Sequence, residues 1–383
     1  MIAKVVSRIT AVAAVLISVS TSSKVLGAEV AYALIVLPEV TEAYDYAPSE
    51  NILLASYFSS NNCDSDCGSS CGCGVGCGSG CCGPQYYAMG EFVLYDRNNS
   101  STRTPLLVDS GSNPLFFTDD LNFDYDFGVR VRLGRKNGPC SHCDACEIEY
   151  LGIFDWDASA TLVDLNNLNL PGVLGFGVVN GLTNADEVRI NYESSLHSIE
   201  ANCVQCCRDD GCRRVDLLCG IRYLRLNENL NIASTNVGAQ VDAIYDIDVD
   251  NNLYGLQVGL RARGRRSSRW GWEAVCKAGI YGNDVQQNQS ILDELGAGPP
   301  DVDRNINSSS SEVGFVGELS FSPMYRLNNM WTLRGGYNLL WIEGVALAPD
   351  QVDFTNTASS GTSIDTSGGV FAHGFSAGLE ARF

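Results

Sequence analysis

The last thirteen residues, FAHGFSAGLEARF (Phe371–Phe383), decide the fold. Apolar side chains and His373 alternate with small or polar residues. Successive side chains of a β-strand point to opposite faces, so this stretch is predicted to form a strand with one apolar and one polar face. The terminal aromatic Phe383 resembles the signal recognised by the assembly machinery of outer-membrane barrels. We therefore expect that machinery to be a partner of the chain.

The same two-residue period recurs upstream, and from Tyr86 onward the helical period is missing. The stretch 123–133 is the clearest example, with an apolar face of Phe123, Tyr125, Phe127, Val129, Val131 and Leu133. In a further alternating stretch, 147–160, Trp156 is predicted on the apolar face. These alternating stretches run for about ten to fourteen residues, whereas soluble strands average about five or six. A membrane barrel is therefore favoured over a soluble β-sandwich.

Aromatic residues at the ends of the apolar faces fit the dimensions of a membrane. Trp331 and Trp341 are ten positions apart, about 25 Å along the membrane normal for a tilted strand, which matches the apolar band of a barrel. The predicted aromatic girdle consists of Trp270, Trp272, Tyr325, Trp331 and Trp341.

Ten strands are predicted, although eight or twelve also fit. They lie near 86–95, 122–134, 147–160, 186–200, 213–227, 252–263, 270–283, 312–325, 330–343 and 371–383. Short connections alternate with longer Asn-, Asp-, Ser- and Gly-rich ones, as in barrels with short periplasmic turns and long outer loops. Residues 240–248 also alternate, and could extend a strand beyond the membrane or add a hairpin. The expected fold is all-β: a transmembrane, antiparallel, up-and-down β-barrel in a bacterial outer membrane, with both ends in the periplasm.

The N-terminus predicts export. Lys4 and Arg8 precede an apolar run, and small residues follow at Gly27 and Ala28, which is the layout of a signal peptide. We therefore divide the chain into a signal peptide (1–28), a Cys/Gly-rich periplasmic segment (29–85) and the barrel (86–383).

The formal net charge of −20 argues against nucleic acid as a partner. The charges on the polar faces of the strands should instead pair inside the lumen. A ten-stranded barrel is close in size to the eight-stranded ones that side chains fill, so a narrow or plugged lumen is expected. Glu147 and Glu149 belong to this polar face, and the main lumen-facing candidates are Asp124, Asp126, Arg130, Arg132, Arg189, Glu193, Arg222, Arg261, Glu273, Glu318, Arg334, Glu380 and Arg382.

Fourteen of the sixteen cysteines are predicted to gather at the periplasmic end; Cys219 and Cys276 are expected on lipid-facing positions. Disulfides are the default in an exported chain. Metal binding stays open because Cys140, Cys143 and Cys146 have the spacing of thiolate ligands. Cross-links to neighbouring copies are a third possibility. The disulfide candidates are Cys63, Cys67, Cys71, Cys73, Cys77, Cys81, Cys82, Cys140, Cys143, Cys146, Cys203, Cys206, Cys207 and Cys212.

No motif in the sequence predicts catalysis. Nucleophile elbows, P-loops and zincin motifs are missing, so no cofactor is expected, and disulfides are favoured over a metal at the cysteines. His373 is expected at the membrane interface, with no serine whose spacing marks it as a catalytic partner. The acidic run from Asp242 to Asp250 lacks the spacing of a calcium-binding EF-hand, so a solvated loop is favoured.

Several segments resemble the planctomycete outer-membrane β-barrel family, which is described as porin-like. They are the cysteine/glycine tract at Cys63–Cys82, Tyr86–Glu91, Leu218–Leu226, Asn251–Gly259 and Gly335–Asn338. The resemblance covers about residues 86–383 and implies an outer-membrane barrel. We expect a narrow pore-forming or structural surface role in contact with outer-membrane lipid. The alternative is an adhesin or receptor that binds a partner through acidic outer loops.

Overall fold

The computed structural model describes residues 86–99, 101–137, 143–174, 181–236, 241–265, 269–295 and 301–383. The predicted signal peptide, the segment 29–85 and Cys140 lie outside these residues. The barrel strands are β1 (Tyr86–Arg97), β4 (Asp126–Lys136), β5 (Ala145–Leu168), β6 (Ala185–Asp209), β7 (Arg213–Asn236), β8 (Val241–Arg265), β9 (Trp270–Leu295), β10 (Asp301–Arg326), β11 (Trp331–Val345) and β12 (Gly368–Arg382).

These ten strands form a closed antiparallel barrel in which each strand pairs with its neighbours in sequence, and β1 closes the ring against β12. The predicted all-β fold with about ten strands is confirmed. A small hairpin, β2 (Pro105–Val108) and β3 (Pro114–Phe117), and the short 3₁₀ helices η3 (Thr118–Asp120) and η5 (Ala348–Gln351) lie in the connections. No helix among the described residues is long and apolar enough to cross a membrane.

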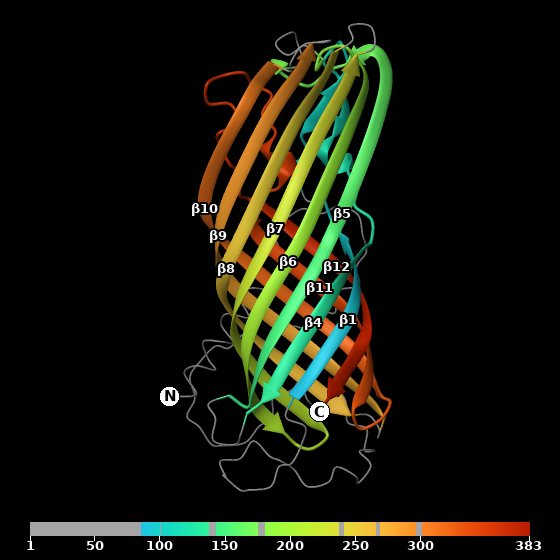
Figure 1. Cartoon of the computed structure of the whole chain (residues 1–383), viewed down its shortest axis with the longest axis vertical. Helices are drawn as coiled ribbons and strands as arrows, with labels where there is room; N and C mark the ends of the chain where they lie inside the picture. Colours follow the sequence, from blue (N-terminus) through green and yellow to red (C-terminus); the bar gives the residue numbers. More distant parts are fainter. Residues whose placement is uncertain are drawn as a thin grey trace, which may run out of the picture. The chain divides into compact units, whose positions relative to one another are not determined.

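The wall is much taller on one side. β5 to β10 have 24 to 26 residues each, whereas β1, β4, β11 and β12 have 11 to 15. Figure 1 shows the long strands continuing far beyond the upper ends of the short ones. The expected long outer loops after residues 227 and 283 are therefore wrong, because residues 228–236 and 241–251 continue β7 and β8, and residues 284–295 and 301–311 continue β9 and β10.

Partway up the tall strands, the apolar residues change from the outward-facing positions to the inward-facing positions. On β7, Ile221 faces outward and Arg222 inward, as lipid outside and a polar lumen require. Higher on the same strand, the buried residues are Leu230 and Ile232, and Asn231 between them faces outward. The lower part of the wall therefore faces lipid, and the upper part faces water around an apolar interior.

A bulge in β5 explains one wrong prediction. The register with β6 shifts between Ile153 and Trp156, so two successive residues, Phe154 and Asp155, both face outward. Trp156, predicted on the lipid face, is completely buried inside the barrel, where its indole N–H donates to the Tyr95 carbonyl at 3.0 Å.

Candidate functional site

The lower part of the lumen is filled by charged side chains. Every barrel strand contributes at least one, and all are nearly inaccessible to solvent. The acids are Glu91, Glu147, Glu149, Glu200, Glu273, Glu318 and Glu380, and the bases are Arg130, Arg132, Arg222, Arg261, Lys277 and Arg334. We call this set the charged layer. The charged layer contains nearly equal numbers of acidic and basic side chains.

Glu318 on β10 is a central link in the charged layer. One carboxylate oxygen lies 2.9 Å from Nη2 of Arg130 on β4. The other lies 3.1 Å from Nζ of Lys277 on β9 and 3.2 Å from Nη1 of Arg222 on β7. The Arg222 and Arg130 contacts join strands that are not neighbours in the wall, so Glu318 ties the lumen together across its width.

Arg334 on β11 makes a second link. Its guanidinium contacts Glu273 at 2.6 Å, Glu380 at 2.9 Å and Glu91 at 3.1 Å. Arg261 on β8 forms two parallel hydrogen bonds of 2.6 Å with Glu147 on β5. Such bidentate pairs combine strong binding with fixed geometry. The side chains that would line an open pore are therefore bound to one another across it.

Above the charged layer the interior is apolar. Its core includes Tyr95, Trp156, Leu226, Ile247 and Ile342 from the wall. Three connections fold into it instead of extending outward: the β1–β4, β5–β6 and β11–β12 segments contribute Leu106, Leu107, Leu121, Phe123, Leu170, Leu174, Leu182, Ala346, Leu347 and Ala348. We call this second filling the apolar layer.

The β11–β12 segment is held by polar side chains of the wall that bind its backbone. The Asn251 amide donates to the carbonyl of Ala346 and accepts from its N–H, both at 2.8 Å. Glu228 accepts the N–H of Ala348 at 2.9 Å, and the Gln289 amide donates to the carbonyl of Gln351 at 2.7 Å. The segment therefore satisfies its buried backbone groups inside the barrel.

The family model described as "Putative beta barrel porin-7 (BBP7)" matches residues 96–383. The chain belongs to this family. It is an outer-membrane barrel protein, as the sequence predicted, and its location is the bacterial outer membrane.

Solved outer-membrane barrels are similar to this BBP7 barrel in fold only. The outer membrane protease OmpT from Escherichia coli is 10% identical, with 78% of this chain and 97% of that chain covered and a TM-score of 0.39. The translocator domain of the autotransporter NalP from Neisseria meningitidis is 10% identical, with 79% and 89% covered and a TM-score of 0.34. No curated protein matches the chain.

The structure places most of the predicted lumen residues of the BBP7 barrel in the charged layer: Arg130, Arg132, Arg222, Arg261, Glu273, Glu318, Arg334 and Glu380. Arg382 binds Glu380 at 2.6 Å and is partly exposed, and Asp126 is half-buried at the start of β4. Glu91, Glu200 and Lys277 were missing from the candidates. Each sits between two residues of the opposite face, and this alternation was the signal that could have identified them.

Three of the predicted lumen residues lie elsewhere. Arg189 and Glu193 are exposed on the outer face of β6, because they lie in the upper part of the wall where the alternation is reversed. Asp124 is exposed in the segment before β4, which starts only at Asp126. Phe123, expected to face lipid, is buried in the apolar layer.

The predicted girdle residues lie on the outer wall. Trp270 and Trp331 are exposed, and Trp272, Tyr325 and Trp341 are partly exposed. Trp270 packs edge-on against Tyr325 with 4.9 Å between ring centroids. At the chain end, Phe383 is exposed and stacks on Tyr86, the first residue of β1, with 6.4 Å between centroids.

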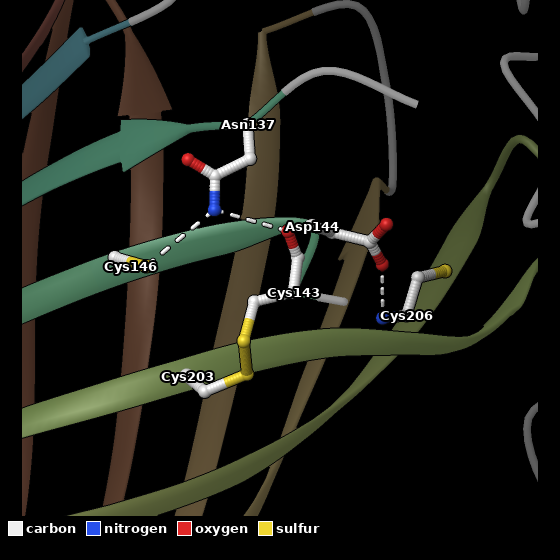
Figure 2. The surroundings of a disulfide bond; sticks show 6 residues. All are labelled: Asn137, Cys143, Asp144, Cys146, Cys203 and Cys206. Atoms are coloured by element: carbon white, nitrogen blue, oxygen red, sulfur yellow. Dashed lines mark hydrogen bonds between the residues drawn. A yellow bond between two sulfur atoms is a disulfide. The ribbon is translucent and has the colours of Figure 1, made fainter. Parts of the chain in front are cut away.

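Four predicted disulfide candidates meet where β5 and β6 approach the β4–β5 connection. Cys143 and Cys203 form a disulfide, with 5.6 Å between their Cα atoms, and Cys206 is also disulfide-bonded. Cys146 is a free, exposed thiol whose Sγ lies 3.4 Å from the side-chain amide nitrogen of Asn137 (Figure 2). Cys219 and Cys276 are exposed on the outer wall. No group of three or more candidate ligands in the described part of the chain has the arrangement of a metal site.

Proposed function

We propose that the protein is a closed, structural barrel of the bacterial cell surface with no open diffusion channel. This proposal rests on the filling of the lumen by two layers of side chains. In the charged layer Glu318 binds bases from three other strands, and above it the apolar layer holds completely buried residues such as Leu347. A general porin keeps a water-filled channel.

The same filling supports a role without catalysis. The described histidines, His197 and His373, lie on the outer wall, and each is paired with a tyrosine hydroxyl, at 2.9 and 3.1 Å. Every member of the charged layer forms at least one ion pair with another member. An origin in a planctomycete remains a prediction from the sequence.

Swelling of proteoliposomes in isotonic solutions of small sugars tests the closed lumen. Vesicles that contain the refolded full-length protein should swell no faster than protein-free vesicles, while vesicles with a general porin swell at once. Sugar-dependent swelling by this protein would overturn the proposal.

A second candidate, an adhesin, has its own supporting observation. The outer wall above the lipid-facing part carries rows of polar side chains across β7 to β10, for example Asn229, Asp248, Asn288 and Asn307 in register. A groove of about 390 Å³ lies on it, lined by residues that include Asp248, Asp250 and Gln286. Binding of whole cells or matrix to immobilised protein that Asp248→Asn and Asp250→Asn together abolish would favour this role.

A further inference from the structure

Below the charged layer, the lower end of the lumen carries a local excess of positive charge, in a chain whose formal net charge is −20. The side chains responsible alternate in phase with the lumen-facing residues of their own strands. We call this set the basic ring: Lys136 on β4, Arg214 on β7, Arg263 and Arg265 on β8, Arg326 on β10 and Arg382 on β12.

The members of the basic ring repel one another. Arg214 and Arg263 are directly opposite in the register of β7 and β8. Lys136 is within electrostatic reach of Arg382 and Arg214, and Arg326 is within reach of Arg382, although these residues lie on different parts of the wall. Like charges that face each other in a sheet are destabilising. An anion bound among these side chains would relieve the repulsion.

Only half of the basic ring is neutralised by the part of the chain that the structure describes. Three members each bind one carboxylate of the lumen at 2.6 Å, in the pairs Arg214–Asp216, Arg263–Glu273 and Arg382–Glu380. Lys136, Arg265 and Arg326 form no ion pair with any described residue. Lys136 and Arg265 are exposed, and Arg326 is partly exposed. The unpaired cations contrast with the charged layer above, where every base has a partner.

The basic ring lies at the end of the barrel that has the short turns. β6 ends at Asp209 and β7 begins at Arg213, and β10 ends at Arg326 shortly before β11 begins at Trp331. The C-terminus lies at the same, lower end (Figure 1). Outer-membrane barrels have their short turns on the periplasmic side. The basic ring therefore faces the periplasm, and its side chains point into the lumen, away from lipid headgroups.

The unpaired cations are too far apart for one small anion. Strands β4 and β8 are four strand spacings apart in the closed ring, which is about 19 Å along the wall. Six residues of an extended polypeptide span about 20 Å. Carboxylates on one side of such a chain repeat about every 7 Å, so one acidic segment can reach both Lys136 and Arg265. Carboxylates are also the anions that the paired members of the basic ring already bind.

We propose that the basic ring is a docking site for an acidic polypeptide segment of a periplasmic partner. Carboxylates of this segment bind Lys136, Arg265 and Arg326, and the segment lies across the periplasmic mouth of the barrel. The site goes beyond the closed, structural role and does not depend on it, because the basic ring lies below both layers that fill the lumen.

Fluorescence anisotropy of rhodamine-labelled hexaglutamate tests this site. The probe is titrated with the refolded full-length protein in a nonionic detergent. Saturable binding is expected at low salt, with an affinity that falls several-fold at high salt because ions screen exposed charges. Hexalysine with the same label should not bind. Arg265→Gln together with Arg326→Gln should weaken the binding of hexaglutamate about tenfold, because two charge-assisted contacts are lost.

Arg135→Gln together with Arg269→Gln is the matched control. Both residues are exposed at the same end of the barrel but lie on its outer side, where Arg135 covers the ring of Tyr86 and Arg269 donates to the hydroxyl of Tyr325. This control should bind hexaglutamate like the wild type. No saturable binding by the wild type, or an equal loss in both double variants, overturns the proposal. Tripolyphosphate that displaces the probe at a far lower concentration than unlabelled hexaglutamate would assign the basic ring to phosphate and overturn the choice of an acidic polypeptide.

Carbodiimide cross-linking locates the bound peptide. The reagent joins a carboxylate to a nearby lysine amine as an amide, and mass spectrometry of the digested protein identifies the lysine. Lys136 should acquire hexaglutamate, whereas Lys277, which is buried in the charged layer and bound to Glu200 at 2.7 Å, should not. A bound peptide that gives no adduct at Lys136 would contradict the proposed site.

Discussion

Arg97 and Glu228 form an ion pair inside the apolar layer, with 2.6 Å between Nη2 and Oε1 and no exposed side-chain surface on either residue. The second carboxylate oxygen of Glu228 accepts the hydroxyl of Tyr192 at 2.7 Å and the N–H of Ala348 at 2.9 Å. The Arg97 guanidinium also lies 4.7 Å from the ring centroid of Phe123. One carboxylate therefore connects β1, β6, β7 and the β11–β12 segment.

Replacing Glu228 should strongly destabilise the barrel. Glu228→Ala leaves the buried Arg97 without its counter-charge, and breaking a buried pair in this way costs about 3–5 kcal/mol. Glu187→Ala is the matched control: Glu187 pairs with Arg189 at 2.6 Å on the outer wall, where such pairs contribute about 0–1 kcal/mol. The free energy of unfolding in urea, followed by tryptophan emission of the refolded protein, measures both. Equal losses would show that the Arg97–Glu228 pair does not stabilise the fold.

Removing the Asn251 amide should loosen the β11–β12 segment. Asn251→Ala removes two hydrogen bonds to Ala346 and leaves buried backbone groups unsatisfied, at a cost of about 1–3 kcal/mol each. Hydrogen exchange at residues 346–348 should therefore become faster. The control, Asn252→Ala, removes the same group from the outer face of β8 and should leave this exchange unchanged. Unaltered exchange in Asn251→Ala would mean that other contacts hold the segment.

Tryptophan quenching should separate the two faces of the wall. In single-tryptophan variants, Trp331 is exposed on the lipid-facing wall and should be quenched by brominated lipid. Trp156 is completely buried in the apolar layer and should not be quenched. Quenching of Trp156, or none of Trp331, would contradict the placement of the strand faces.

Acidification should release part of the β11–β12 segment. Burial alone would raise the pKa of Asp353, but hydrogen bonds from Thr355 and Gly361 and the charge of Arg304 hold this pKa below its ordinary value. The contribution of Asp353 to stability is therefore complete above its unfolded pKa and is lost as the pH falls through the lower folded pKa. Proteolysis at residues 353–361 should increase in this acidic range. Asp353→Asn should remove this pH dependence, and the exposed Asp124→Asn should retain it.

The sequence predicted the barrel because its strongest signal, strict alternation, depends only on lipid outside and polar groups inside. Arg222 and Glu318 could be assigned to the lumen on this basis. Arg189 and Glu193 could not, because in the upper wall water replaces lipid outside and folded-in connections replace polar groups inside. In the upper wall, charged residues on one face of a strand therefore indicate the outer, water-facing side. The phase reversal between Arg222 and Asn231 on β7 is visible in the sequence, but its meaning depends on where the membrane ends.

Two further features need the three-dimensional structure. The bulge at Phe154 and Asp155 shifts Trp156 to the interior, and neither of the two bulged residues is a proline or glycine that would mark it. The role of Glu228 depends on partners up to 131 positions away in the chain. Long-range contacts of this kind follow from barrel closure and not from local patterns.

The most direct test of the closed lumen is the ionic conductance of the refolded full-length protein in planar lipid bilayers. Because the charged layer and the apolar layer each fill the interior, the account predicts no stable current steps. The same silence is expected for Glu318→Gln, since the apolar layer is unaffected by this substitution. Reproducible current steps from the unmodified protein, at the conductance of a water-filled channel, would contradict the account.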